Sequence, residues 1–230
     1  MTIRITLGDG LDDLAAADRD GIMTALEGAR GRASARLELS DGQITVIGAP
    51  HLVMPERGMG SRTLDRHAAL IALDPGSATL RAPERELRLG ALLSYALYRL
   101  ARARHPASGW TPGRGFCATL GKALLSEGLA LHFEEEMGFP RPPQAVAVER
   151  DPLWDLGTRA MAAFDDPHVD GDAWFHGRPA GRCFPPHGGA SLGYALVRAW
   201  LMLSETLPSE ELGLESNEVL SAWRTGRLDI

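Results

Sequence analysis

The stretch ALLSEGLALHFEEEMG, residues 123–138, repeats apolar side chains at the spacing of an α-helix. The apolar stripe consists of Leu120, Ala123, Leu124 and Leu131. We expect this stripe to be buried, and Glu127 lies on it. A buried carboxylate is costly unless it is paired, hydrogen-bonded, protonated or bound to a metal, so the position of Glu127 points to a function. The glutamates at 134–136 come at the helix end, where we expect them to face water.

Size and charge limit the classes of function. The chain has 230 residues, of which 44% are hydrophobic, and this is enough for a substantial core. Its net charge of -6 gives no general attraction to nucleic acid or to an anionic membrane, so neither is an expected partner. Arg99, Arg102 and Arg104 form one local basic strip, which we interpret as a solvent-exposed helix face.

The expected compartment is the cytoplasm. The first residues, MTIRITLGDGLDDLAAADRDG, lack the basic and apolar regions of a secretory signal, and no stretch approaches 18 uninterrupted apolar residues. The two cysteines, Cys117 and Cys183, have no CxxC spacing and are too few for a disulfide framework. We therefore expect both thiols to be reduced.

Strand patterns come first along the chain and helix patterns follow. A short strand is expected at 2–6 and an amphipathic helix at 11–29. The further strand-like runs are ARLELS (35–40), ITVIGA (44–49) and AALIALDPG (68–76). Helices are expected at about 84–105, 116–138, 152–164, 190–206 and 216–224.

This order indicates an α+β fold. We expect a single domain over 1–230, with a sheet-rich part at 1–82 and a helical part at 83–230. The segment FPRPPQ, 139–144, ends one helix because proline cannot continue it. A loop at 172–193, rich in glycine, proline and aromatic residues, is of the kind that often lines a site.

The sequence gives only weak evidence for a serine hydrolase or for a histidine metal site. GASLG (189–193) matches GxSxG, but a proline-rich segment precedes it and no histidine follows His187, contrary to the α/β-hydrolase order. The histidines form no HxH or HExxH pair. His132 and Glu136 are four residues apart and offer two metal ligands, but no third is identifiable, so we favour a solvated pair.

Hydroxyl groups offer a partner for Glu127. In the helix expected at 84–105, Ser94 and Tyr98 are one turn apart on the same stripe. They are either satisfied core hydroxyls or hydrogen-bond donors to Glu127, with Tyr95 as a further candidate. Such donors would offset part of the cost of removing the carboxylate from water.

Four blocks of sequence resemble one known family. They are VMPERGMGSRTLDRHAALIALDPG (53–76), LLSYALYRLARARHP (92–106), TLGKALLSEGLALHF (119–133) and WFHGRPAGRCFPPHGGASLGYALVRAWL (174–201). In this order they resemble the bacterial predicted zinc-dependent proteases, a family catalogued as a domain of unknown function. The resemblance covers roughly residues 50–225, and the SEGLA segment and the WFHG to LGYALV block are its most specific parts.

The resemblance implies a zinc site that this chain has lost. Family members that look active carry HExxH, in which two histidines hold zinc and the glutamate is the general base, with the SEGLA glutamate as third ligand. At the matching positions this chain has Ser94, Tyr95 and Tyr98, and only Glu127 is kept. One carboxylate without imidazole or thiolate ligands does not hold zinc tightly, so we expect no metal, no cofactor and no zinc hydrolysis.

The resemblance also implies a zincin-like fold and a cleft that binds a peptide or a small ligand. We expect the strand in AALIALDPG to border this cleft as the edge strand of the sheet. Trp174, His176 and Tyr194 are the expected ligand contacts, although the first two are equally well explained as a packed loop anchor. Ala190 replaces a tyrosine that relatives often carry, which argues against inherited oxyanion chemistry.

Three hypotheses follow. The favoured one is a catalytically inactive protease homologue that keeps its ligand cleft. The second is a non-zinc enzyme in which Glu127 acts as general acid or base beside tyrosine hydroxyls. The third is a purely structural or partner-binding protein, and the sequence indicates no particular oligomeric state for any of the three.

Overall fold

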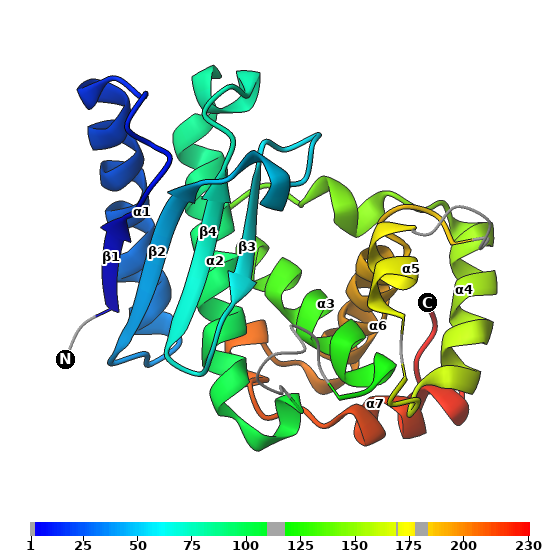
Figure 1. The fold of residues 1–230 in the computed structure, drawn as a ribbon. Coiled ribbons are helices and arrows are strands. Elements are labelled where there is room, and N and C mark those ends of the chain that lie inside the picture. Colours follow the sequence, from blue (N-terminus) through cyan, green and yellow to red (C-terminus); the bar gives the residue numbers. More distant parts are fainter. Residues whose placement is uncertain (1–2, 110–117, 169, 178–183) are drawn as a thin grey trace. The chain divides into compact units, whose positions relative to one another are not determined.

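The computed structural model describes residues 3–109, 118–168, 170–177 and 184–230. These residues form seven α-helices and a four-stranded mixed sheet (Figure 1), which confirms the expected mixture of strands and helices. The chain divides into two compact units, Met1–Ala101 and Arg102–Ile230. Both cysteines lie outside the described residues, so their state stays a prediction.

The first unit contains the sheet. Its strands are β1 (Ile3–Leu7), β2 (Gly42–Gly48), β3 (Met59–Thr63) and β4 (Ala68–Leu73). They are arranged in the order β1-β2-β4-β3, in which β1, β2 and β4 are parallel and β3 is antiparallel to β4. The helix α1 (Ala16–Arg36) connects the parallel neighbours β1 and β2, because such neighbours require a crossover connection.

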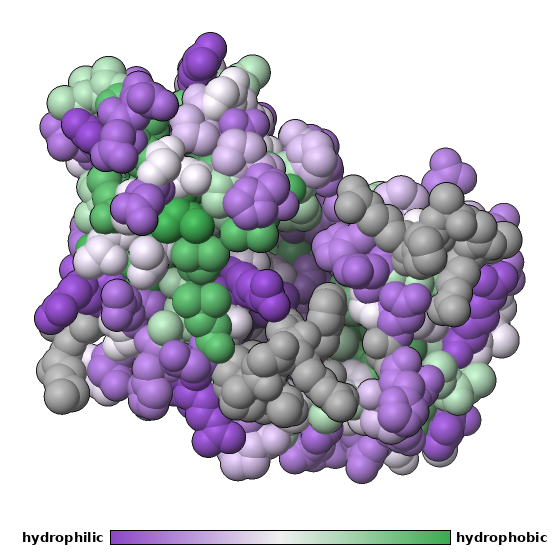
Figure 2. Space-filling model, viewed as in Figure 1, coloured by the Kyte–Doolittle hydropathy of each residue, from purple (hydrophilic) through white to green (hydrophobic). Residues whose placement is uncertain are grey.

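One face of the sheet forms the core of the first unit. Ile5, Ile44 and Ile71 point to this face and are buried, as the period-2 alternation of a strand requires. Figure 1 shows α1 and α2 (Arg85–Arg104) on one side of the sheet. Side chains of the opposite face, such as Leu70, are half-buried, and Figure 2 shows hydrophobic residues gathered over the strands there.

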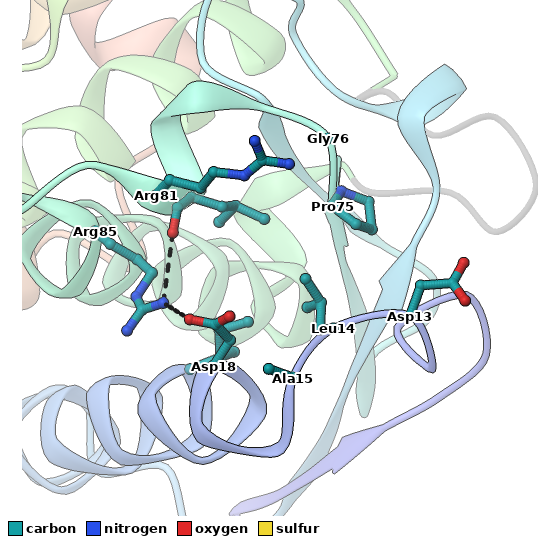
Figure 3. Close-up of a pocket in the computed structure, with 10 residues that line it drawn as sticks. Asp13, Leu14, Ala15, Asp18, Pro75, Gly76, Arg81 and Arg85 are labelled. Carbon is teal, nitrogen blue, oxygen red and sulfur yellow. Dashed lines mark hydrogen bonds and ion pairs between the residues drawn. The ribbon is translucent and has the colours of Figure 1, made fainter.

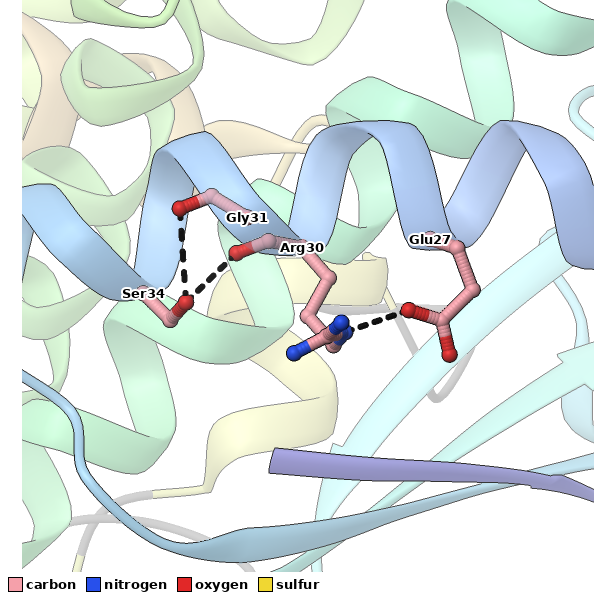
Figure 4. Close-up of polar contacts among 4 residues, drawn as sticks. All are labelled: Glu27, Arg30, Gly31 and Ser34. Carbon is pink, nitrogen blue, oxygen red and sulfur yellow. Dashed lines mark hydrogen bonds and ion pairs between the residues drawn. The ribbon is translucent and has the colours of Figure 1, made fainter. Parts of the chain in front are cut away.

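The helix α1 begins later and ends later than expected. Its buried side chains recur at helical spacing and are Ile22, Leu26, Ala29 and Ala33, and buried Leu37 continues the series directly after the helix. The expected strand 35–40 is therefore wrong, because its apolar residues extend this stripe. Near the end of α1, Glu27 pairs with Arg30 and the Ser34 hydroxyl donates to the Arg30 carbonyl oxygen (Figure 4).

The expectation that AALIALDPG forms the edge strand is wrong. Its strand, β4, is paired on both sides, with β2 and with β3. The edges of the sheet are β1 and β3. The β3 sequence MGSRT was not recognised as a strand, since it has a glycine and only one β-branched residue, and pairing with β4 imposes its conformation.

The second unit is helical. Its helices are α3 (Leu120–Glu136), α4 (Arg150–Ala163), α5 (Gly171–His176), α6 (Gly188–Ser204) and α7 (Ser216–Arg224). The backbones of α3 and α6 approach closely at two glycines: a Cβ atom on Gly128 would lie 2.1 Å from the Gly193 carbonyl oxygen. A Cβ atom on Gly193 would lie 2.3 Å from the Leu124 carbonyl oxygen, so both positions require glycine.

Arg102 is part of the core of the second unit and not of an exposed basic strip. It is 1% exposed, and its Nη1 and Nη2 atoms each donate a hydrogen bond of 2.8 Å, to the carbonyl oxygens of Leu212 and Leu214. Its Nε atom donates to the Ser126 hydroxyl at 3.1 Å. The expected solvent exposure of Arg102 is therefore wrong, because its guanidinium group satisfies buried carbonyl groups of the 211–214 segment.

No helix in the described ranges combines the length and the apolar character needed to cross a bilayer.

Candidate functional site

The expected site residues are distributed over both units. Ser94, Tyr95 and Tyr98 lie on the part of α2 that belongs to the first unit. Glu127 on α3, Trp174 and His176 on α5, and Tyr194 on α6 belong to the second unit.

The hydroxyl groups of Ser94 and Tyr95 have partners within α2. Ser94 is 1% exposed, and its Oγ donates a hydrogen bond of 3.0 Å to the Gly90 carbonyl oxygen. A hydroxyl has one hydrogen, so Ser94 in this arrangement does not also donate to Glu127. The Tyr95 hydroxyl accepts from Arg99 Nη1 at 2.8 Å, and the Arg99 guanidinium lies 5.6 Å from the Tyr95 ring centroid. Tyr98 is fully buried.

Glu127 is half-buried, although its neighbours Ser126 and Gly128 are buried. The stripe around it is buried as expected, since Ala123, Leu124 and Leu131 are all buried, but the Glu127 side chain itself is only partly covered. A buried carboxylate does occur two turns later: Glu134 is 1% exposed. It belongs to the acidic run that was expected to face water.

The acidic run is covered because other segments pack against the end of α3. Glu135 accepts a hydrogen bond from the Tyr194 hydroxyl on α6. Glu136 accepts from both the backbone N–H and the hydroxyl of Ser209, at 3.0 Å and 2.6 Å. The sequence at the end of α3 does not predict that these glutamates are covered, because the covering segments lie about 60 to 70 residues away in the chain.

Tyr194 is the centre of a polar cluster. Its hydroxyl donates to Glu135 Oε1 at 2.5 Å, and its ring is stacked on the His132 ring with centroids 3.9 Å apart. His132 Nε2 lies 3.0 Å from the Tyr194 carbonyl oxygen, and Nε2 must carry the proton because a carbonyl only accepts. Arg141 Nε donates to Glu135 at 3.4 Å, and the Arg141 guanidinium lies 5.5 Å from the Tyr194 ring centroid.

Burial sets the charge state of this cluster. Burial lowers the pKa of His132, and the hydrogen bond to the Tyr194 carbonyl opposes this only in part. Burial and the neighbouring Glu135 carboxylate raise the pKa of Tyr194 to about 12. At neutral pH both rings are therefore uncharged, and the Tyr194 hydroxyl acts as a donor to Glu135 and not as a nucleophile.

His132 and Glu136 do not form the start of a metal site. His132 contacts Tyr194, whereas Glu136 binds Ser209. Across the described ranges, no three His, Cys, Asp or Glu side chains are placed to hold a metal ion. The hydroxyl side chains of Ser94, Tyr95 and Tyr98 are not the imidazole or thiolate donors that zinc prefers, so the residues at these positions do not fit the metal.

The segment expected as a long loop contains two helices, α5 and the start of α6. Trp174 is buried and its ring centroid lies 4.7 Å from that of Phe184, which agrees with a packed anchor. His176 is exposed at the end of α5. Residues 178–183 of this segment lie outside the described residues.

Ser191 of the GASLG motif has a structural role. It is 1% exposed, its Oγ donates to the Gln144 carbonyl oxygen at 2.9 Å, and it accepts from the Val148 N–H at 3.3 Å. It lies within α6 and not on the exposed strand-to-helix turn of a hydrolase nucleophile. These bonds hold the 144–148 segment against α6.

Comparison of the chain with known protein families, with curated proteins and with solved structures finds no match.

Proposed function

We propose that this chain is a zincin-like binding protein that holds an extended peptide along the edge strand β3 and does not hydrolyse it through zinc. The observation that carries the proposal is that, in the described part of the chain, no strand pairs with the outer side of β3 after Met59. The sequence resemblance to zinc-dependent proteases supports it, as does the chemistry of Ser94, Tyr95 and Tyr98, which are poor zinc ligands.

The hydrogen-bond pattern defines which groups of β3 are available. Asp74 N–H donates to the Gly58 carbonyl oxygen, and Leu64 N–H donates to the Ala68 carbonyl oxygen. In an antiparallel pair, hydrogen-bonded positions alternate, so Gly60 and Arg62 also pair with β4. The N–H and C=O groups of Ser61 and Thr63 then point to the opposite side.

The start of this edge is already covered. Met54 N–H bonds to the Met59 carbonyl oxygen, and the two residues form an isolated antiparallel bridge. Ser61 and Thr63 follow this bridge and extend the same side of β3. An extended peptide adding to this side would gain backbone hydrogen bonds, which is the recognition mode of β-augmentation.

The test uses fluorescently labelled, unfolded casein as the probe. We expect the anisotropy of the probe to rise on binding while gel electrophoresis shows it intact after prolonged incubation. Ser61→Pro removes the outward N–H, and loss of this hydrogen bond together with the bulk of the ring should weaken binding about tenfold. Ser61→Ala keeps the N–H and is the matched control, with affinity close to that of the wild type.

Two results would refute the proposal. One is cleavage of casein that a chelator stops, which would show zinc hydrolysis. The other is equal binding by Ser61→Pro and Ser61→Ala in folded proteins, which would place the binding elsewhere. The alternative of a non-zinc enzyme required a water-excluded Glu127, and its half-buried side chain gives that alternative no support.

A further inference from the structure

A cavity of about 400 Å³ lies in the first unit at the start of α1 (Figure 3). Its walls come from three segments: residues 13–22, the loop after β4, and the residues that lead into α2. The parallel strands β1 and β4 end at the same edge of the sheet, so the connections that follow them meet there. In open sheets with parallel strands, this is the edge at which ligands bind, and the volume suits a small molecule.

The wall of the cavity is partly apolar. The apolar lining residues are Leu14, Ala15, Ile22, Pro75 and Leu80. Ile22 and Leu80 also belong to the core, with exposed fractions of 1% and 4%. This part of the wall is therefore fixed by packing and offers a surface for an apolar ligand body.

Arg85 and Asp18 neutralise each other in the wall. Arg85 Nη1 donates a hydrogen bond of 2.8 Å to Asp18 Oδ1 and a second one of 3.5 Å to the Leu80 carbonyl oxygen. The Arg85 guanidinium lies over Gly21, where a Cβ atom would be 2.7 Å from Nη2. Arg85 can lie here only because glycine at position 21 has no Cβ atom.

Arg81 contributes a positive charge that forms no ion pair with any residue the structure describes. Its exposed side chain has no ion pair or hydrogen bond within residues 3–109, 118–168, 170–177 and 184–230. Figure 3 shows the carboxylate of Asp13 turned away from Arg81 and Arg85. Ala15 precedes α1 without a side-chain cap, so the first-turn N–H groups add partial positive charge beside the cavity.

We propose that this cavity binds a small organic acid with one carboxylate and an apolar body. The carboxylate pairs with Arg81, and the apolar body contacts Leu14, Pro75 and Leu80. Arg81 is the lining arginine without an ion pair in the described part of the chain, whereas Arg85 is paired with Asp18, so the site matches one negative charge. This site does not depend on peptide binding at β3.

The test measures binding of three probes by calorimetry on the full chain: phenylacetate, its neutral analogue phenylacetamide, and inorganic phosphate. We expect phenylacetate to bind more tightly than phenylacetamide, and phosphate to bind more weakly than phenylacetate because it lacks the apolar body. Arg81→Gln should weaken phenylacetate binding about tenfold or more, as expected for a lost charged hydrogen bond. Arg88→Gln, an exposed arginine outside the cavity, should leave the affinity unchanged.

Gly21→Ala tests the cavity wall independently. The added methyl group would displace the Arg85 guanidinium and reshape the wall, so the affinity for phenylacetate should change if the probe binds in this cavity and stay the same if it binds elsewhere. The proposal is overturned if phenylacetate and phenylacetamide bind equally, if neither binds at millimolar concentration, or if phosphate binds best. Equal effects of Arg81→Gln and Arg88→Gln would also overturn it.

Discussion

At the scale of single residues, the cluster around Tyr194 shows how burial determines chemistry. Burial keeps the His132 ring neutral, and the hydrogen bond to the Tyr194 carbonyl oxygen places its proton on Nε2. Tyr194 in turn keeps its proton through burial and through its hydrogen bond to Glu135. The cluster joins α3 to α6 and is therefore a structural contact whose strength depends on pH.

His132 should make stability fall as the pH falls. Its pKa is lowered in the folded state, so below the ordinary value of about 6.5 the unfolded chain takes up a proton that the folded chain resists. His132→Gln keeps a donor for the Tyr194 carbonyl but does not titrate. We expect urea unfolding to show that the wild type loses more stability than His132→Gln as the pH is lowered from about 7.5 to 5.5.

His176→Gln is the control for this experiment, because His176 is exposed. It should follow the wild type over the whole pH range. Parallel stability curves for the wild type and His132→Gln would contradict the assignment of this pH dependence to His132.

At the scale of elements, glycines have opposite roles in α1 and α3. A Cβ atom at Gly28 or Gly31 of α1 would meet nothing within 4 Å, so glycine there only lowers helix propensity. A Cβ atom at Gly128 of α3 would collide with the backbone of α6. The same residue type is thus replaceable in one helix and required in the other.

Alanine substitutions separate these roles. Gly28→Ala and Gly31→Ala should each raise the free energy of unfolding by about 0.5–1 kcal/mol, because alanine restricts the unfolded chain and favours the helix. Gly128→Ala should lower it by about 1–3 kcal/mol through overpacking. Thermal and urea unfolding would measure both effects. A stabilising Gly128→Ala would contradict the close contact between α3 and α6.

Helices and strands with a clear hydrophobic periodicity could be predicted from the sequence, and those without one could not. The helix at 216–224 was predicted at its observed bounds, and the helices α2, α3 and α6 were predicted within a few residues. The strand β3 was missed because its pairing with β4 is not encoded in the composition of MGSRT. The short helix α5 was missed because its sequence, GDAWFH, contains too few residues for a helical period.

At the scale of the whole molecule, the boundary between the two compact units falls near the end of α2, inside the part of the chain whose pattern is helical. Sequence patterns report local periodicity, whereas a compact unit is defined by contacts between distant segments. Arg102 illustrates this, since its partners lie more than 100 residues away in the chain. The cluster around Tyr194 was only partly predictable for the same reason: Tyr194 is expected as a ligand contact, whereas its contacts with His132 and Glu135 have no signal in the local sequence.

The proposed function requires that the chain does not bind zinc, because Ser94, Tyr95 and Tyr98 are poor zinc ligands. The most direct measurement is the zinc content of the chain, purified without chelator or affinity metal, before and after addition of zinc. We predict far less than one zinc per chain, and no rise in melting temperature when zinc is added. Close to one zinc per chain, with a melting temperature that a chelator lowers, would contradict the account.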